Sequence, residues 1–205
     1  MIAAVMIASL VGALAASLTF VVTIESRVGR HHQSAQSGAY AAAAGIERLI
    51  GELRRWPTWQ TIPSMTSTAP SFNDGRTVPT LADGTALDLP RRTSERQAAS
   101  DAFYPSGSNR PVWTLYAHAS LARITAIGVP MSNPYVVVWI ADDPDDLDGD
   151  PSRDSNGVIL VRAEAFGVRG GWRAIEATLG ASIVRDGAGA AVASQVTVIA
   201  WREAR

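Results

Sequence analysis

The sequence begins with a long uncharged stretch. From Ile2 to Ile24 there is no charged residue, and most positions are Ala, Val, Ile, Leu, Met or Phe. A helix rises about 1.5 Å per residue, so roughly 20 such residues cross the hydrocarbon core of a bilayer, which is about 30 Å thick. A cleavable signal peptide would have a basic start and a shorter apolar run. The stretch therefore predicts a membrane-spanning helix over residues 1–24, in preference to a signal peptide or a buried core helix.

The helical pattern continues beyond the apolar stretch. Residues 25–56 are mostly helix formers, with Ile46, Leu49, Ile50 and Leu53 at helical spacing, and Pro57 ends the pattern. We expect one helix of about 55 residues, roughly 80 Å long, whose second half is extracytoplasmic and packs on a sheet. Charged side chains are expected on the other faces of this half: Glu47, Arg48, Glu52, Arg54 and Arg55.

Charge, cysteine content and missing motifs exclude several functions. The chain has 205 residues, with 18 basic and 19 acidic side chains, so no overall field points to nucleic acid. Cysteine is absent, which excludes disulfides, thiolate metal sites and a cysteine nucleophile. No GxSxG, phosphate-loop or HExxH motif occurs. His118 is expected to be a packed or surface residue, because no nucleophile is paired with it in the sequence. We therefore expect a protein that is not an enzyme.

Residues 57–134 are expected to form an irregular, variable segment. The segment is rich in Pro, Ser, Thr, Asp and Gly, and prolines interrupt it throughout. Such a length of irregular chain is uncommon inside a compact domain and usually forms a functional or variable surface. Short strands are expected at Thr77–Leu81 and Ala86–Leu89. One charged group is expected to be a solvated patch, formed by Arg91, Arg92, Glu95 and Arg96.

The last third of the chain, residues 135–205, predicts an antiparallel sheet. Alternating and β-branched runs are typical of strands, and short turns between them make antiparallel neighbours. One apolar face of this sheet needs a cover, and the amphipathic half of the first helix is the one long candidate. We expect an α+β fold with about four strands, at Tyr135–Ala141, Gly157–Phe166, Trp172–Leu179 and Gln195–Trp201.

A loop rich in aspartate, which we call the aspartate loop, separates the first two of these strands and has seven aspartates with its flanks. Carboxylates at alternate positions of a tight loop can converge on a hard cation, and positions 1, 3, 5 and 9 of an EF-hand loop are matched. However, Pro151 stands where that loop has Gly, and Gly157 where it has a bidentate acid, so a solvated acidic turn stays the alternative. The candidate Ca²⁺ ligands are Asp146, Asp148, Asp150 and Asp154.

Three blocks of the sequence resemble the type IV pilin family, and in particular the PilX-type minor pilins. They are the apolar helix running into SGAYAAAAGIERLIGELR (Ser37–Arg54), the strand VVVWIADD (Val136–Asp143), and DGDPSRDSNGVILVRAEAFGVRGGWRAIEATL (Asp148–Leu179). The last block is the most specific, with an Asp-rich turn, an Asn-Gly pair, a strand, a Gly-rich turn and a closing strand. The likeness covers roughly Ile2–Trp56 and Tyr135–Arg205.

The resemblance implies a type IV pilin-like fold and a minor pilin or pseudopilin-like subunit. Such a subunit takes part in assembly of a type IV pilus or a type II secretion pseudopilus. Its implied partners are other pilin or pseudopilin subunits, contacted through the first helix, together with inner-membrane lipid and the pilus assembly machinery. Small residues on that helix favour close helix packing in lipid; they are Ala3, Ala4, Ala8, Gly12, Ala13, Ala15 and Ala16.

The expected location is the bacterial inner membrane, with a single pass and the C-terminal domain in the periplasm, or the pilus at the cell surface. Arg27 and Arg30 follow the apolar run, and the positive-inside rule alone would place them in the cytoplasm. Pilins begin with a short basic leader ending in Gly, which would hold the N-terminus in the cytoplasm. We therefore expect the translated product to begin upstream of Met1 with such a leader. The alternative function is a membrane-anchored extracytoplasmic binding module, adhesin-like, that contacts a ligand through residues 57–134 and the aspartate loop.

Overall fold

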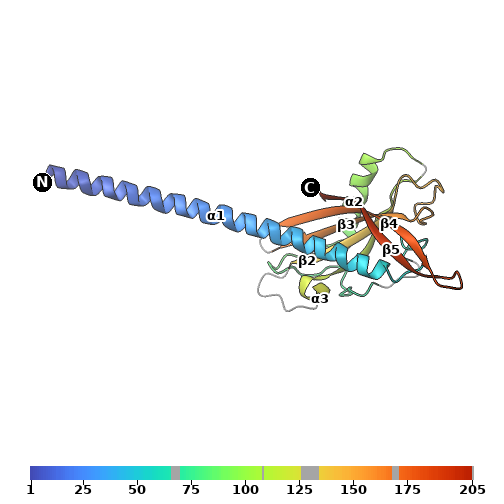
Figure 1. Ribbon diagram of the computed structural model, residues 1–205. Coiled ribbons are helices and arrows are strands. Elements are labelled where there is room, and N and C mark those ends of the chain that lie inside the picture. The colour runs from blue at the N-terminus through green and yellow to red at the C-terminus, as the bar shows by residue number, and fades with distance from the viewer. Residues whose placement is uncertain (66–69, 108, 126–133, 168–170, 205) are drawn as a thin grey trace. The chain divides into compact units, whose positions relative to one another are not determined.

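The computed structural model describes residues 1–65, 70–107, 109–125, 134–167 and 171–204. The chain divides into two compact units, Met1–Gln36 and Ser37–Arg205. Helix α1 (Ile2–Leu53) makes up the first unit and continues into the second (Figure 1). The second unit adds two helices, α2 (Leu89–Phe103) and α3 (Leu121–Thr125), and five strands: β1 (Thr114–Ser120), β2 (Tyr135–Asp142), β3 (Val158–Phe166), β4 (Trp172–Arg185) and β5 (Ala191–Ala204).

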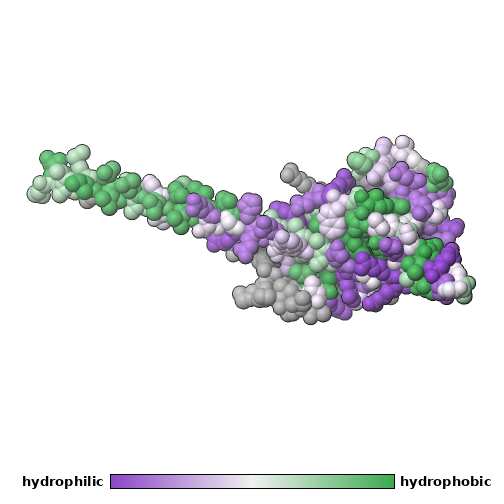
Figure 2. Space-filling view, in the orientation of Figure 1, coloured by the Kyte–Doolittle hydropathy of each residue, from purple (hydrophilic) through white to green (hydrophobic). Residues whose placement is uncertain are grey.

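The first part of α1 is apolar, and its side chains are exposed. Figure 2 shows hydrophobic colouring along this part of the helix. None of its most apolar 18-residue window is buried, and among the described residues α1 is the one helix long and apolar enough to cross a membrane. The expected helix is thus present, ending at Leu53, a few residues before Pro57.

The sheet is antiparallel throughout, with strand order β1-β2-β3-β4-β5. The four expected strands are confirmed as β2 to β5, and the α+β class holds. The expected number of strands is too low, because β1 forms a fifth strand beside β2. Within residues 57–134, which were expected to be irregular, the structure has α2, β1 and α3. Residues 57–65, 70–88 and 104–107 form turns, bends and isolated bridges, as expected.

One face of the sheet is covered by the second half of α1. Ile46, Leu49, Ile50 and Leu53 are buried, as their helical spacing predicts, and they join one apolar cluster with alternate residues of the strands. Gly45 allows the closest approach of helix and sheet, since a Cβ atom there would lie 2.7 Å from Cγ1 of Val136. The prediction that this half-helix covers the sheet is confirmed.

Glu52 departs from the expectation that the charged residues of α1 face solvent. Its side chain is buried, accepts a hydrogen bond from the Tyr116 hydroxyl of β1 (2.7 Å), and is also bonded to the backbone and hydroxyl of Ser71. Arg48 lies 3.6 Å from the same carboxylate. This acid is retained in the interior because its oxygens are hydrogen-bonded, and it ties α1 to β1 and to the segment around Ser71.

The opposite face of the sheet is covered by α2. Asp88 caps this helix by accepting a hydrogen bond from the backbone N–H of Arg91 (2.9 Å), and Pro90 occupies the first turn, where its missing N–H is harmless. Residues 86–89 were expected to form a strand, but they make an isolated bridge from Ala86 to Thr80 and then begin α2. Leu89 packs with Trp139 and other residues of β2 in a second apolar cluster.

Strands β4 and β5 extend beyond the rest of the sheet. Pairing of β4 with β3 ends at Gly180, whereas its pairing with β5 continues to Arg185. The two strands therefore form a two-stranded ribbon over residues 181–196. Strand β5 is also an edge of the sheet, and most of its side chains are exposed.

Candidate functional site

The aspartate loop, residues 143–157, connects β2 to β3 and is shaped by its own carboxylates. Asp148 accepts a hydrogen bond from the backbone N–H of Asp150 (2.9 Å), and Asp150 accepts one from that of Ser152 (3.0 Å). Aspartates that bond the backbone two residues ahead form local turns. Gly149 and Gly157 have φ of 70° and 78°, the left-handed region that glycine adopts at low cost. The alternating aspartates thus set successive turns in the backbone.

The structure brings together two of the four predicted ligands. Asp146 and Asp154 are buried, whereas Asp148 and Asp150 are exposed at the surface of the loop. Asp142, the last residue of β2, is fully buried beside the first pair. One carboxylate oxygen from each of Asp142, Asp146 and Asp154 lies within 4.8 Å of the other two. We call these three residues the acidic cluster.

Hydrogen bonds hold two members of the cluster in place. Asp154 accepts from the backbone N–H groups of Gly157 (2.7 Å) and Val158 (3.1 Å), which fixes the chain as it enters β3. Asp146 accepts from the backbone N–H of Ser155 (2.7 Å) and from its hydroxyl. These bonds orient both carboxylates from within the loop.

The three carboxyl groups differ in their acidity. Burial raises the pKa of Asp142 to about 7, opposed by a hydrogen bond from Asn109 and reinforced by the charges of Asp146 and Asp154. Burial likewise raises the pKa of Asp154 to about 6, although two backbone N–H groups oppose the shift. Burial acts in the same direction on Asp146, but the hydrogen bonds from Ser155 outweigh it and lower the pKa. Ionising all three carboxyl groups is therefore unfavourable, because burial and their mutual repulsion oppose the charged forms.

Asn109 is a neighbour that the sequence did not reveal. Its amide nitrogen donates to Oδ2 of Asp142 (2.6 Å) and to the carbonyl of Asp143 (2.7 Å), and the residue is buried. It lies between α2 and β1, about thirty residues away in the chain. No sequence pattern distinguishes a single Asn in an irregular segment. Asp142, in contrast, could be noticed because it directly follows the apolar run of β2.

A second group of charged residues lies between α2 and the sheet. Arg92 donates to Glu164 of β3 (2.9 Å), and Arg162 of the same strand donates to the other oxygen of Glu164 (2.8 Å). Arg96 and Arg162 both bond Glu176 of β4. The expectation of a solvated patch is therefore wrong for Arg92 and Arg96, which are partly buried in this network.

Aromatic rings complete the contacts of the two arginines of α2. The guanidinium carbon of Arg92 lies 4.9 Å from the centre of the Trp172 ring, and that of Arg96 lies 5.0 Å from the Trp113 ring. Cations attract the faces of aromatic rings in this range, most strongly when both are shielded from water. These contacts fix α2 on the sheet and give the network a structural role.

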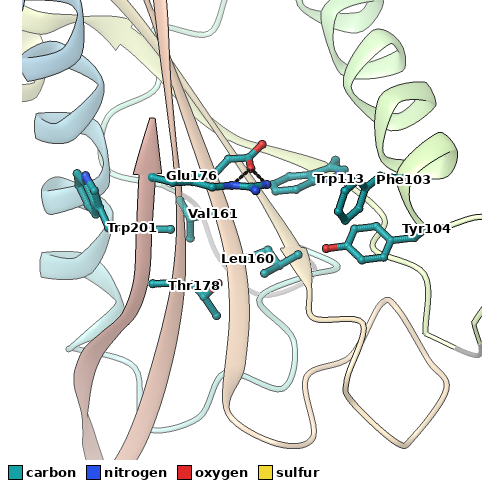
Figure 3. Close-up of a pocket in the computed structure, with 11 residues that line it drawn as sticks. Phe103, Tyr104, Trp113, Leu160, Val161, Glu176, Thr178 and Trp201 are labelled. Atoms are coloured by element: carbon teal, nitrogen blue, oxygen red, sulfur yellow. Dashed lines mark hydrogen bonds and ion pairs between the residues drawn. The ribbon is translucent and has the colours of Figure 1, made fainter. Parts of the chain in front are cut away.

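A half-open cavity of about 330 Å³ lies beside this network. Figure 3 shows Phe103, Tyr104 and Trp113 on the side of α2 and the segment after it, with Leu160 and Thr178 of the sheet opposite. The walls are largely apolar, and Glu176 and Arg202 add charged groups. Cavities of this size with a few polar groups can hold a small apolar or aromatic ligand group.

The imidazole of His118 contacts Tyr135 and Asp74. It is buried on β1, as a packed residue, with its Nδ1 atom 2.7 Å from the Tyr135 hydroxyl and 3.1 Å from an oxygen of Asp74. Burial lowers the pKa of His118, and Asp74 opposes that shift. These bonds join the segment around Asp74 to the outer strand of the sheet.

Comparisons of the chain with protein-family models, with curated proteins and with solved structures found no match.

Proposed function

We propose that this chain is a minor pilin or pseudopilin-like subunit. In this proposal it is anchored in the bacterial inner membrane and takes part in assembly of a type IV pilus or a type II secretion pseudopilus. One observation carries the proposal: a single continuous helix has an exposed apolar first part and a second part that forms the core of an antiparallel sheet domain. The sequence blocks that resemble minor pilins lie in this helix and in strands β2 to β4.

The first part of α1 is suited to lipid because its few polar groups are satisfied within the helix. Ser9, Ser17, Thr19 and Thr23 each donate to the backbone carbonyl four residues earlier, at 2.7–2.9 Å. An unsatisfied polar group in hydrocarbon costs several kcal/mol. These hydroxyls therefore add little to the cost of transferring the helix into a bilayer.

The same part of α1 is the proposed contact with other subunits. Helices in lipid associate through close packing, which small residues permit. Gly12, Ala13 and Ala16 lie in the exposed apolar stretch, and a Cβ atom at Gly12 would meet nothing within 4 Å. An adjacent helix can thus approach this surface closely. In this proposal the sheet domain lies in the periplasm and enters the pilus together with the helix.

The test introduces one charge into the helix. Leu14→Arg places a cation near the middle of the apolar stretch, where insertion scales assign a cost of about 2.5–3.5 kcal/mol. We expect loss of piliation or secretion in a deletion strain complemented with this variant. The matched control is Ala98→Arg, which adds the same charge at an exposed position of α2. Normal assembly with Leu14→Arg, measured at equal protein levels, would refute the role given to this helix.

The orientation is tested in intact cells. The chain has no cysteine, so a single introduced thiol can be labelled without background. Thr80→Cys lies at an exposed position of the sheet domain. We expect this thiol to react with a membrane-impermeant maleimide once the outer membrane is permeabilised. Protection until the inner membrane is lysed would place the domain in the cytoplasm and contradict the proposal.

The cavity beside α2 favours a second candidate function, that of a membrane-anchored binding module. Its walls come from α2, from the segment after it and from the sheet, so residues of the middle of the chain contribute to it. Ala200→Trp would fill this cavity from β5. If ligand binding is the function, this variant should lose the phenotype that the wild-type gene restores while it keeps membrane insertion. A pilus subunit should tolerate it.

A further inference from the structure

The acidic cluster concentrates negative charge in the interior of the sheet domain. Asp142, Asp146 and Asp154 are each at most 2% exposed. Among the described residues, no Arg or His side chain forms an ion pair with any of them. Buried carboxylates are costly unless a partner balances their charge. The described side chains supply only hydrogen bonds, from Asn109 and Ser155, and no positive charge.

Two buried oxygens at the cluster also lack hydrogen-bond partners. Oδ1 of Asp142 and Oδ1 of Asn109 are inaccessible to solvent and accept no hydrogen bond. Both belong to residues that are at least 99% buried and that are bonded to each other through their remaining polar atoms. Most buried polar side-chain atoms in proteins have a partner. An orphan carboxylate oxygen within a group of three converging carboxylates indicates a cation as the partner.

We propose that Asp142, Asp146 and Asp154 form a calcium site that closes the β2–β3 loop, with Asn109 beside it. The ligands are all oxygen atoms, with no His in the group, which favours a hard cation over a transition metal. Ca²⁺ binds oxygens at about 2.3–2.6 Å, so two of its ligands lie up to about 5 Å apart. Three ligand atoms that all lie within 4.8 Å of one another meet this requirement.

Magnesium fits this arrangement less well. Mg²⁺ holds its ligands at about 2.0–2.1 Å and demands a near-ideal octahedron. It also keeps several of its waters and is seldom bound by an all-protein cage. The site differs from the EF-hand-like set expected from spacing, because Asp142 comes from the end of a strand and Asp148 and Asp150 take no part.

Calcium at this point would connect four segments of the domain. The cluster lies at the end of β2, in the loop before β3, and against Asn109 of the segment before β1. The backbone N–H of Asp154 also donates to the carbonyl of Gln60, in the segment after α1 (3.2 Å). Because the cation binds the folded arrangement and not the unfolded chain, its binding stabilises the fold.

The experiment measures Ca²⁺ binding to the full chain in detergent micelles by isothermal titration calorimetry. We expect one saturable site in the wild type. Asp142→Asn and Asp154→Asn should each weaken binding at least tenfold, since each removes a charged ligand while keeping the side-chain shape. The matched control is Asp148→Asn, which removes the same charge from an exposed position of the same loop and should bind as the wild type does.

Melting in EGTA, Ca²⁺ or Mg²⁺ gives the second measurement. We expect Ca²⁺ to raise the melting temperature of the wild type and of Asp148→Asn more than equal Mg²⁺ does, with no such rise in Asp154→Asn. Asp142→Asn should stay folded in EGTA, because it removes a buried charge; its circular dichroism spectrum checks this. Absence of saturable binding, or equal loss in Asp148→Asn and Asp154→Asn, would show an acidic surface that only attracts counterions and would overturn the proposal.

Discussion

The two faces of the sheet are each covered by a helix, but the side chains under α1 and under α2 are of different kinds. Apart from the hydrogen-bonded Glu52, the contacts under α1 are apolar and tightly packed, with Gly45 allowing close approach to β2. Under α2 a cluster around Leu89 is joined by arginines and glutamates from both elements. Apolar packing depends on shape and volume, whereas the charged network depends on every partner being present. The two faces should therefore respond differently to substitution, and to acid.

The largest effect is expected on the α2 face. Glu164 is 3% exposed and bonds both Arg92 and Arg162. Glu164→Gln removes the charge that balances them, and breaking a buried pair from one side costs about 3–5 kcal/mol. Denaturant unfolding of the full chain in detergent, followed by tryptophan fluorescence, measures the loss.

The control for this prediction is Glu95→Gln on the same helix. Glu95 pairs with Arg91 and Arg92 at the surface, where such pairs contribute about 0–1 kcal/mol. Similar small losses for Glu164 and Glu95 would mean that the network beneath α2 does not hold the helix, and the contrast between the two faces would disappear.

The next effect concerns the α1 face. Leu49→Ala removes a fully buried side chain from the apolar cluster, and such truncations cost about 2–5 kcal/mol. Because the lost contacts are apolar, the loss should be the same at low and at high salt. The exposed neighbour Glu47→Ala serves as the control and should change the free energy of unfolding by no more than about 0.5 kcal/mol. A strongly salt-dependent loss of stability in Leu49→Ala would contradict the view that apolar packing dominates around this residue.

The patterns that predicted the fold came from the α1 face. Helical spacing of Ile46 and Leu49, and alternation along β3, are periodic signals that burial of one face produces. Helix α2 was missed because its side facing the sheet includes the partly buried Arg92 and Arg96, which resemble a solvated surface in the sequence. The sequence did contain a local indication of the start of this helix, namely the capping residue Asp88 followed by Pro90 in the first turn.

The acidic cluster was predictable in part for a similar reason. Alternation of aspartates marks a loop rich in turns, and two of the aspartates it singled out, Asp146 and Asp154, lie close together in the structure. Spacing cannot distinguish an aspartate that bonds its own backbone, such as Asp150, from one that converges with others. Asp142 and Asn109 come together only through the packing of β2 against the segment before β1, which involves contacts distant in sequence.

A smaller effect tests how closely α1 approaches the sheet. Gly45→Ala places a Cβ atom 2.7 Å from Val136 Cγ1 and 3.2 Å from Val138 Cγ2, so the helix or the valines must shift. Overpacking of this kind costs typically about 1–3 kcal/mol. Gly51→Ala in the same helix meets nothing within 4 Å and should instead stabilise by about 0.4–1 kcal/mol. Thermal melts of the two variants measure these changes. A change of melting temperature in the same direction for both variants would refute the prediction.

The smallest effect is the pH dependence that Glu176 contributes to the α2 face. Burial alone would raise the pKa of Glu176, but hydrogen bonds from Arg202 and Arg162 outweigh it and lower the pKa below its usual 4.5. A carboxyl group with a lowered pKa stabilises the fold above pH 4.5, and this contribution is lost as pH falls through the folded pKa. Melts between pH 5 and 3 should show a steeper loss for the wild type than for Glu176→Gln. If the melting temperatures of the wild type and of Glu176→Gln fell equally with pH, Glu176 would not be a source of the acid sensitivity.

The two-stranded ribbon at residues 181–196 influences how the domain opens. At its base, the backbone N–H groups of Ala181 and Ser194 donate to Gly157 and Arg54, whereas the outer part, residues 184–193, pairs β4 with β5 and exposes the apolar side chains of Val184 and Val192. An isolated pair of strands is only marginally stable in water. Amide hydrogens of the ribbon will therefore exchange with solvent through local fraying, at a free energy well below that of global unfolding. The central strands β2 and β3, which are paired on both sides, will exchange only when the whole sheet separates.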